Sequence, residues 1–223
     1  MAAILIGTTV LLAAGMGLRG TASCLESASF VTGAACVWLT VKENVWNFPI
    51  GLVNVATFGF VFLRAGLFAD AGLQIVYLIL CARGWHLWLH GGREGTRLHV
   101  TRAGRGELNG LLVCIILLTL LLWLVLRHVG GSASFWDALT TSVSIGSQWL
   151  LNRKRLESWM GWILVDAIYV PLYVSKSLYL TAVLYAIFLG LAIMGQRRWQ
   201  ENWRTHQVAV RMPEPFPCGE AVT

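Results

Sequence analysis

Charged side chains are scarce in this chain of 223 residues: they make up 13% of it, against about 25% in soluble domains. Hydrophobic residues make up 57%, which is more apolar surface than a soluble core of this size could bury. The uncharged run 108–126 has the roughly 20 residues that cross a bilayer, whereas a buried soluble helix would be shorter and amphipathic. These features predict an all-α polytopic membrane protein.

Signatures of catalysis and of metal or nucleotide binding are also missing. None of the five histidines has a HExxH partner, and the chain contains no GxSxG motif and no Walker loop. The five cysteines form no CxxC pair, so we expect neither disulfides nor zinc, and we interpret them as small packing residues. We therefore expect no enzyme, no ATP-driven pump within this chain, no metal and no cofactor.

The net charge of +6 would suit nucleic acid, but the distribution of the basic residues indicates a membrane. They gather in the loop 91–107, in the turn 153–155 and in the tail beyond 196. Short loops rich in Lys and Arg lie on the cytoplasmic side of membrane proteins. We therefore expect a lipid bilayer and no nucleic acid as partner, with the basic loops and the C-terminus in the cytoplasm.

The hydrophobic residues fall into eight apolar segments, at 2–18, 28–45, 49–66, 70–90, 108–128, 135–151, 158–174 and 177–196. The first could be a signal peptide, but it lacks the basic start that signal peptides have. We interpret residues 1–20 as an additional N-terminal hydrophobic helix, with cleavage or a misassigned start as alternatives. The polar tail 200–223 contains three prolines and predicts a short helical extension followed by a disordered end.

An internal repeat organises the other segments. Residues 38–88 align without a gap with 149–199, and the alignment pairs Trp38 with Trp149, Gly84 with Gly195, and Trp88 with Trp199. Each copy, 28–90 and 135–199, holds three segments, and the linker helix 108–128 lies between them. A single linking span makes the two copies point the same way, which predicts a three-one-three parallel repeat. Transporters of this architecture bind their cargo near the midplane, between the repeats.

One polar and aromatic stripe is the strongest candidate site. Trp159, Trp162, Asp166 and Tyr169 are spaced by three, four and three residues, so they share one helix face. Gln148 and Asn152, at i and i+4, share another. An acid within a span is a functional candidate by default, although Asp166 could instead pair with a basic side chain for structural reasons. Tryptophan faces attract cations, and amides and carboxylates bond hydroxyls, so the stripe suits a flat, cationic, hydroxyl-bearing ring.

Further candidates lie in the first copy of the repeat. Gln74 and Tyr77 share a face within a span, where polar groups either line a cavity or hydrogen-bond between helices. Four others lie near span ends, where tryptophan also forms interfacial belts; they are Trp46, Asn47, Trp85 and Trp88. The sequence leaves the cavity and belt interpretations open.

Several of these runs resemble PnuC-type vitamin transporters. The second half of that family is similar to 148–173 and 176–185, and its first half to 46–51, 67–77 and 84–88, so that the resemblance covers residues 28–203. It implies a three-one-three helix arrangement like that of SWEET transporters. It also implies facilitated diffusion of nicotinamide riboside, or of thiamine, riboflavin or deoxynucleosides in sister transporters. Trapping of the cargo by a cytoplasmic kinase and association as a homotrimer are further implications.

The resemblance and the residue patterns together give one functional prediction. We expect uptake of nicotinamide riboside for NAD biosynthesis, across a bacterial cytoplasmic membrane. By motif match, the resemblance implies a pocket built from Gln74, Trp85, Trp88, Gln148, Asn152, Trp159, Trp162, Asp166 and Tyr169. The alternatives are a sister vitamin transporter of the same fold and a non-transporting scaffold or receptor. A scaffold would have no need to bury amides and an acid.

Overall fold

The computed structural model describes residues 24–64, 68–129, 134–177 and 179–211. Within these ranges the chain forms seven α-helices and no β-strand. They are α2 (Cys24–Val41), α3 (Asn47–Arg64), α4 (Phe68–His90), α5 (Arg105–Val129), α6 (Ser134–Asn152), α7 (Ser158–Ser175) and α8 (Tyr179–Arg211), with one 3-10 turn at Arg93–Gly95. The all-helical prediction is confirmed for these residues. The expected helix at 2–18 and the chain beyond 211 lie outside them.

Three helix ends differ by four residues or more from the limits of the apolar segments, and the first is the start of α2, which lies at Cys24 rather than at residue 28. Helix α2 ends at Val41 rather than near residue 45, because Glu43 adopts a left-handed backbone conformation with φ 55°, which ends an α-helix. Helix α8 continues to Arg211, beyond the apolar segment that ends at 196. Its extension contains four arginines and two glutamines, which are good helix formers even where no apolar face requires them.

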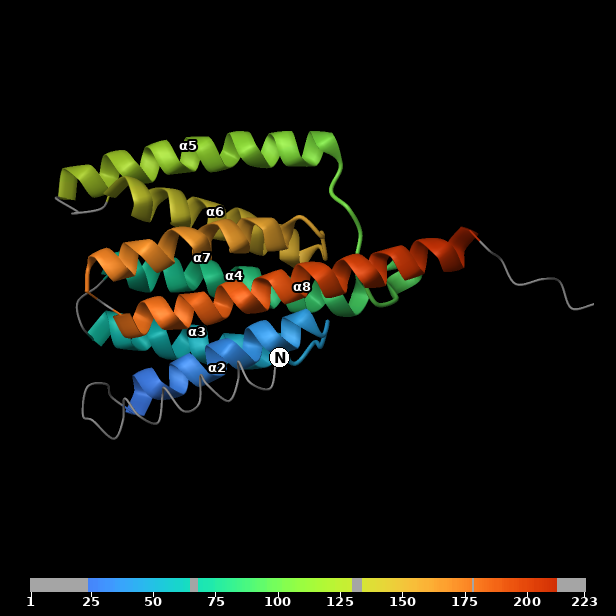
Figure 1. Ribbon diagram of the computed structural model, residues 1–223, viewed down its shortest axis with the longest axis horizontal. Helices are drawn as coiled ribbons and strands as arrows, with labels where there is room; N and C mark the ends of the chain where they lie inside the picture. The colour runs from blue at the N-terminus through green and yellow to red at the C-terminus, as the bar shows by residue number, and fades with distance from the viewer. Residues whose placement is uncertain (1–23, 65–67, 130–133, 178, 212–223) are drawn as a thin grey trace, which may run out of the picture.

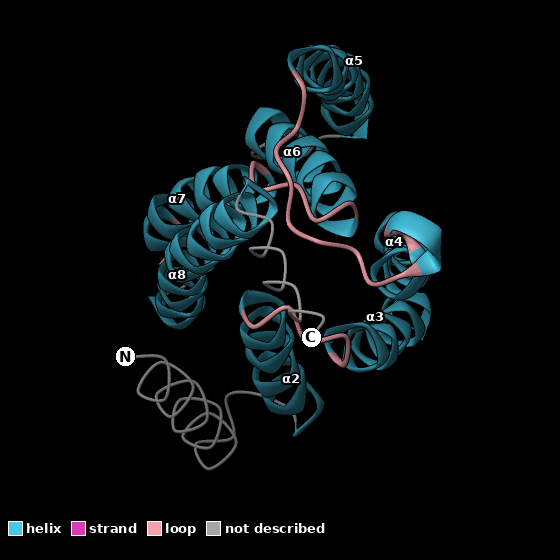
Figure 2. Ribbon diagram, turned by 90° about the vertical axis from the view of Figure 1, so that its right-hand side faces the viewer, coloured by secondary structure: helices cyan, strands magenta, loops and turns pink. Residues whose placement is uncertain are grey.

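Six of the helices form a ring, and α5 lies outside it beside α6 (Figure 2). Within the ring each helix packs on its neighbours in sequence, while α2 contacts α8 and α4 contacts α6. Among the described helices, the span Arg105–His128 of α5 is the one that passes a combined test of length and mean hydropathy, at 2.7. Its Leu112, Leu117 and Leu121 are each more than half exposed, as expected for a helix in contact with lipid.

The two copies of the predicted repeat make equivalent contacts, in which each residue of one contact lies 111 positions from its counterpart in the other. The Trp88 indole N–H donates to the Leu151 carbonyl, and the Trp199 indole N–H donates to the Thr40 carbonyl, both at 3.1 Å. Both pairs of equivalent positions, 88 with 199 and 40 with 151, have this spacing. Each indole thus donates to the C-terminal end of a helix in the other helix triplet, to α6 of α6–α8 or to α2 of α2–α4, which fixes the two triplets against each other.

The rings around these indoles follow the same spacing. Phe48 meets Trp88 edge to face at 5.0 Å and 89°, and Trp159 meets Trp199 at 5.3 Å and 87°. The turns 42–46 and 153–157 also match: Glu43 and Lys154 both adopt positive φ, and Lys154 Nζ lies 2.8 Å from Glu43 Oε2. These two turns directly follow the helix ends whose carbonyls accept the indole N–H groups. They lie beside the aromatic cluster formed by Phe48, Trp88, Trp159 and Trp199.

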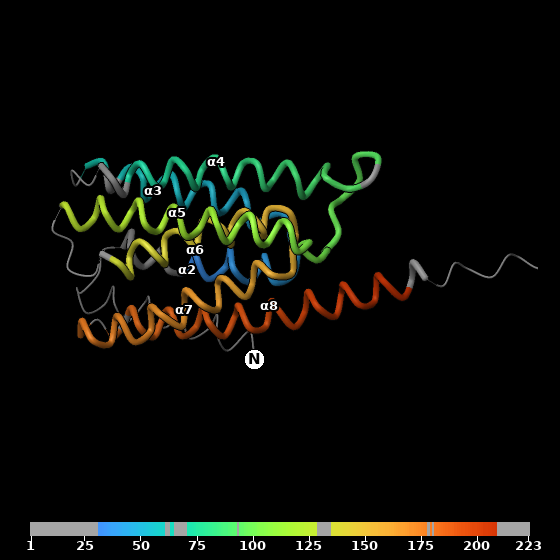
Figure 3. Tube along the Cα trace, turned by 90° about the horizontal axis from the view of Figure 1, so that it is seen from above, coloured from blue at the N-terminus to red at the C-terminus, as the bar shows by residue number. Residues whose placement is uncertain are grey.

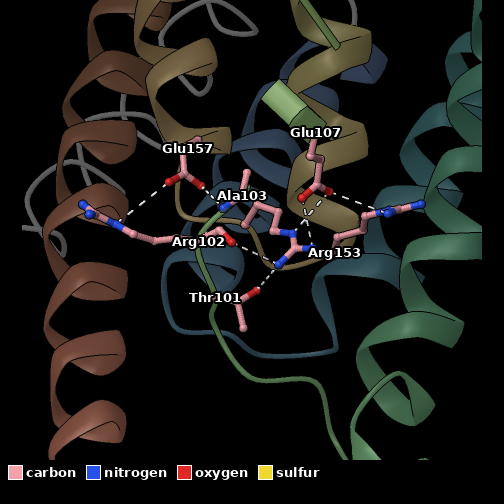
Figure 4. Close-up of polar contacts among 7 residues, drawn as sticks. Thr101, Arg102, Ala103, Glu107, Arg153 and Glu157 are labelled. Carbon is pink, nitrogen blue, oxygen red and sulfur yellow. Dashed lines mark hydrogen bonds and ion pairs between the residues drawn. The ribbon is translucent and has the colours of Figure 1, made fainter. Parts of the chain in front are cut away.

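Most of the basic residues lie at the same end of the bundle. The turn 153–157, the loop 91–104 and the end of α8 all lie there (Figures 1 and 3). Arg155 Nη2 pairs with Glu107 Oε2 at 3.0 Å, and Arg155 Nη1 donates to Thr101 Oγ1 at 2.8 Å. Glu157 accepts the Ala103 backbone N–H at 2.8 Å (Figure 4). The loop is therefore fixed to the α6–α7 turn at several points.

Candidate functional site

A cavity of about 390 Å³ lies inside the ring of six helices. Its volume falls in the range of small-molecule sites, about 300–1,000 Å³. All six ring helices contribute to its wall, and α5 contributes nothing. The lining residues are Cys36, Val37, Thr40, Asn47, Phe48, Gly51, Val55, Tyr77, Cys81, Ser144, Gln148, Leu151, Trp159, Trp162, Val165, Asp166, Tyr169, Tyr185, Phe188 and Ala192.

The stripe on α7 lines this cavity along its whole length. Trp159, Trp162, Asp166 and Tyr169 all belong to the wall, as their helical spacing requires once one of them faces inward. The side chain of Asp166 is 5% exposed, and no basic side chain in the described part of the chain forms an ion pair with it. The indole nitrogens of Trp159 and Trp162 are buried without a hydrogen-bond partner. These two donors are enclosed by the protein, while the rings that carry them belong to the cavity wall.

Two amide side chains complete the polar wall. Gln148 lines the cavity, and its Nε2 donates to Asn152 Oδ1 at 3.0 Å; Asn152 stands behind it, outside the lining set. Asn47 lines the cavity on α3, and its Nδ2 donates to Thr40 Oγ1 at 2.8 Å. Asn47 Oδ1 is buried and has no partner among the described residues. Both lining amides therefore donate through their nitrogens, and neither oxygen accepts a hydrogen bond from another described residue.

The other predicted residues lie elsewhere, except Tyr77, which lines the cavity within hydrogen-bonding reach of Ser144. Trp88 is 1% exposed and packs in the aromatic cluster beside the cavity. Trp85 and Trp46 are 36% and 67% exposed, as residues of an interfacial belt would be. Gln74 packs against Gly59 of α3. The structure brings seven of the twelve predicted residues to the cavity: Trp159, Trp162, Asp166, Tyr169, Gln148, Tyr77 and Asn47.

Some lining residues escape sequence reasoning. Phe48, Gly51, Val55 and Phe188 are apolar or small, and no local pattern marks them. Their signal is the repeat itself, because each lies 111 positions from a predicted residue, at Trp159, Trp162, Asp166 and Tyr77 respectively. The same spacing links Val37 to Gln148 and Tyr185 to Gln74, whereas Cys36, Thr40 and Ser144 lie 111 positions from no predicted residue.

Many residues of the cavity wall occupy equivalent positions in the two copies of the predicted repeat, but the paired side chains differ in chemistry. Seven pairs of lining residues differ by 111: 37 with 148, 40 with 151, 48 with 159, 51 with 162, 55 with 166, 77 with 188 and 81 with 192. Position 51 is a glycine where the equivalent position 162 is a tryptophan, and position 55 is a valine where position 166 is an aspartate. The acid and both indoles thus belong to one side. A bound ligand would meet an aromatic, acidic wall on α7 and a smaller, mainly apolar wall on α3.

The charge of the wall restricts what can bind. Its lining residues include Asp166 and no lysine, arginine or histidine. In a site of low dielectric constant, an unpaired carboxylate attracts a cation and repels an anion far more strongly than in water. Indole faces attract cations as well. The arrangement suits a flat cationic molecule with hydrogen-bond donors, and it disfavours a phosphate ester.

Known proteins resemble this chain over most of its length. A sequence model of the nicotinamide mononucleotide transporter family matches residues 23–201. The nicotinamide riboside transporter PnuC of Escherichia coli (strain K12) is 24% identical over 211 residues, covering 82% of this chain and 87% of its own. The riboflavin/roseoflavin transporter RibM of Streptomyces davaonensis is 24% identical over 174 residues, covering 76% and 81%. Both relatives are transporters rather than enzymes.

The fold also has a counterpart among solved structures. A crystal structure of the vitamin B3 transporter PnuC matches the present structure with a TM-score of 0.72, covering 92% of both chains at 21% identity. At this level of identity the likeness shows a common fold.

Proposed function

The chain belongs to the nicotinamide mononucleotide transporter family, and from this premise we propose that it carries nicotinamide riboside across the membrane by facilitated diffusion. The observation that carries the proposal is the unpaired Asp166 beside the indoles of Trp159 and Trp162. The pyridinium ring would stack on an indole face, with its positive charge near the carboxylate. The ribose hydroxyls would bond the free oxygens of Asn47, Gln148 and Asp166.

The same charges favour the riboside over the mononucleotide. A phosphate ester carries a charge of about −1.5 to −2 at neutral pH and needs cationic donors. The lining set contains none and contains Asp166 instead. Phosphorylation of the cargo by a cytoplasmic kinase would therefore prevent its return through the same cavity. That argument supports net uptake without an ion gradient.

We further propose that the two helix triplets form a parallel three-one-three repeat, with α5 as the linker. The contacts that recur at a spacing of 111 residues support it. Access would alternate by rocking one triplet against the other. The basic end of the bundle would face the cytoplasm of a bacterial inner membrane. A homotrimer is part of the same proposal, and the mass of the detergent-purified complex tests it.

Riboflavin is the second candidate cargo, because the riboflavin/roseoflavin transporter RibM covers 76% of this chain and flat rings of either kind suit an aromatic wall. The two cargoes differ in charge, since riboflavin is neutral. Asp166 favours the cation. Replacement of Asp166 should therefore weaken the binding of nicotinamide riboside and leave a neutral flavin nearly unaffected.

A binding titration tests the proposed function directly. The purified full chain is titrated with nicotinamide riboside, nicotinamide mononucleotide, thiamine and riboflavin. We expect the riboside to bind at least about tenfold more tightly than the mononucleotide, the ratio that 1.4 kcal/mol gives. Tighter binding of riboflavin or thiamine would replace the proposed cargo. Tighter binding of the mononucleotide would contradict the charge argument.

A further inference from the structure

The orientation of Gln148 is determined by a residue that lies outside the cavity wall. Asn152 is 2% exposed, and its Nδ2 donates to the Leu80 carbonyl of α4 at 2.7 Å. A carbonyl can only accept, so the nitrogen of Asn152 must face it. Asn152 Oδ1 then faces Gln148 and requires a donor, which Gln148 Nε2 supplies at 3.0 Å. If the Gln148 amide turned over, two acceptor oxygens would face each other.

A glycine makes this arrangement possible. A Cβ atom at Gly84 would collide with Asn152 Oδ1 and would lie 2.6 Å from the Phe48 ring. Gly84 lies one helical turn after Leu80, so the absence of its side chain leaves the Leu80 carbonyl accessible to Asn152. The chain of hydrogen bonds thus begins on a fixed backbone atom of α4 and ends on the Gln148 amide of α6.

A second chain of the same kind holds Asn47. Thr40 Oγ1 donates to the Cys36 carbonyl at 2.8 Å, which uses its only proton. The hydroxyl oxygen is then an acceptor, and Asn47 Nδ2 donates to it at 2.8 Å. Asn47 Oδ1 is left buried and has no partner in the described part of the chain.

We infer that Asn152 and Thr40 are positioning residues: they hold the two cavity amides with their oxygens free, so that the cavity recognises hydrogen-bond donors of its cargo. Asp166 adds a carboxylate of the same polarity on α7. Acceptors thus come from three helices, α3, α6 and α7. A cargo whose donors are blocked should be rejected even if its shape fits. The inference rests on the proposed function for the choice of cargo.

The test compares nicotinamide riboside with analogues in which one donor at a time is methylated, at each ribose hydroxyl or at the carboxamide nitrogen. In the wild-type chain, methylation of the donor that meets an amide oxygen should lower affinity about tenfold, as for a hydrogen bond to a buried polar group. In Asn152→Leu, the Gln148 amide loses its fixed partner and can turn. The penalty for one methylation should then fall to about twofold or less.

Asn152→Asp separates positioning from structural support. Asn152→Leu removes both the donor to the Leu80 carbonyl and the acceptor for Gln148 Nε2. The aspartate keeps an acceptor for Gln148 Nε2 in either protonation state, and it donates to the Leu80 carbonyl only when protonated. We expect Asn152→Asp to retain the wild-type methylation penalty and Asn152→Leu to lose it. A merely structural role would change both variants alike, with equal losses for methylated and unmethylated cargo, and that result would overturn the inference.

The Thr40 chain has a closely matched control on α5. Thr40 and Thr119 are both 6% exposed, and both donate to the carbonyl four residues earlier. Thr40→Val should abolish one methylation penalty, and Thr119→Val should abolish none. Equal behaviour of these two variants would overturn the role of Thr40. Thr40→Val also keeps the inference falsifiable if Asn152→Leu does not fold.

The experiment can contradict the proposed cargo and the inference about the positioning residues separately. If the wild-type chain does not bind nicotinamide riboside, the proposed cargo is wrong. The same methylation series is then measured on whichever vitamin of the panel binds, such as riboflavin with its ribityl hydroxyls methylated. If the wild-type chain binds the riboside but shows no penalty for any methylation, the proposed cargo stands and the inference fails.

Discussion

Asp166 is the residue of this site whose burial destabilises the fold most. Its side chain is almost fully buried, it has no basic partner among the described residues, and it adjoins two indoles with unused donors. A buried acid without a partner destabilises a fold, and a bound cation would remove part of that cost. A ligand-binding role therefore accounts for the residue better than a structural one.

Two substitutions on α7 should reduce affinity to different degrees. Trp162→Phe keeps an aromatic face but weakens it, and we expect a loss of about 1 kcal/mol, or about fivefold in affinity. Asp166→Asn keeps the shape and removes the charge, and we expect a larger loss, about 1.5–3 kcal/mol. Calorimetric titration with nicotinamide riboside measures both, and thermal unfolding of the same samples reports their stability.

Matched variants outside the cavity serve as controls for these losses. Trp149→Phe and Asp137→Asn lie on α6, outside the lining set, and should bind the cargo as the wild-type chain does. Full affinity in both Trp162→Phe and Asp166→Asn, whatever their melting temperatures, would remove the α7 stripe from the site.

Only part of the candidate site could be predicted residue by residue. The α7 stripe was accessible because helical spacing places Trp159, Trp162 and Asp166 on one face, and an acid within a span is rare. Tryptophans near span ends are ambiguous, because a belt, a core and a cavity all favour them. Trp88 belongs to the core and Trp46 to the surface. Their difference depends on tertiary packing, which no local pattern contains.

At the scale of elements, the α2–α3 and α6–α7 turns form a contact that must open if cargo leaves at the basic end. Lys154 Nζ pairs with Glu43 at 2.8 Å and lies 4.5 Å from the centre of the Trp88 ring. Its side chain is 8% exposed, so the pair is poorly screened by solvent. Breaking a buried ion pair by removing one partner is strongly destabilising. Loss of Lys154 should therefore favour separation of the two turns.

Two cysteines of the cavity wall can report that opening. Cys36 and Cys81 both line the cavity, and the other three cysteines can be replaced by serine. In Lys154→Gln, we expect a membrane-impermeant maleimide added at the cytoplasmic face to label them about tenfold faster, as the loss of one charged hydrogen bond allows. Labelling rates in inside-out vesicles provide the measurement.

Arg153→Gln is the control for this experiment. Arg153 lies on the same turn, but it pairs with Glu107 of α5 at 3.6 Å and is itself half-exposed, so its loss leaves the contact across the ring intact. Unchanged labelling in Lys154→Gln, or equal increases in both variants, would show that the Glu43–Lys154 pair does not restrain the opening.

Helix positions were predictable to within a few residues because apolar length and loop charge determine them. The ends were less accessible. Helix α2 ends early because Glu43 is left-handed. The polar residues of α8 favour a helix beyond residue 196, but the contacts of that segment do not follow from its propensity: Asn202 donates to Glu43 at 2.6 Å, and Arg102 lies over the Trp203 ring. Such contacts join residues distant in sequence, so local propensity cannot reveal them.

For the whole molecule, the gathering of basic segments at one end predicts its orientation in the membrane. In a cysteine-free background, Arg97→Cys should resist an impermeant thiol reagent in intact cells and react in inside-out vesicles. Lys176→Cys, at the α7–α8 turn, should show the opposite pattern. Strong labelling at position 97 from outside the cell would reverse the proposed topology.

Transport by the whole molecule should be passive. Proteoliposomes containing the purified chain should equilibrate labelled nicotinamide riboside without ATP or an ion gradient, since the chain has no nucleotide-binding motif. Nicotinamide mononucleotide loaded inside should stay there, because the cavity lacks cationic donors. Accumulation above equilibrium that disappears when a sodium or proton gradient is collapsed would reveal a coupled carrier.

Many of the lining positions are paired between the two copies of the proposed repeat. The orientation of the cargo in the cavity therefore depends on which copy carries the aromatic and acidic side chains. Under the proposed repeat, exchanging the side chains of all the paired lining positions, Gly51 with Trp162 and Val55 with Asp166 among them, would move the aromatic, acidic wall from α7 to α3, by half a revolution about the membrane normal. The cargo would then lie rotated by the same half revolution, while its depth in the bilayer and its affinity stayed nearly the same. Duplication would thus have produced two equivalent binding positions, and this chain has kept the aromatic and acidic residues of one of them.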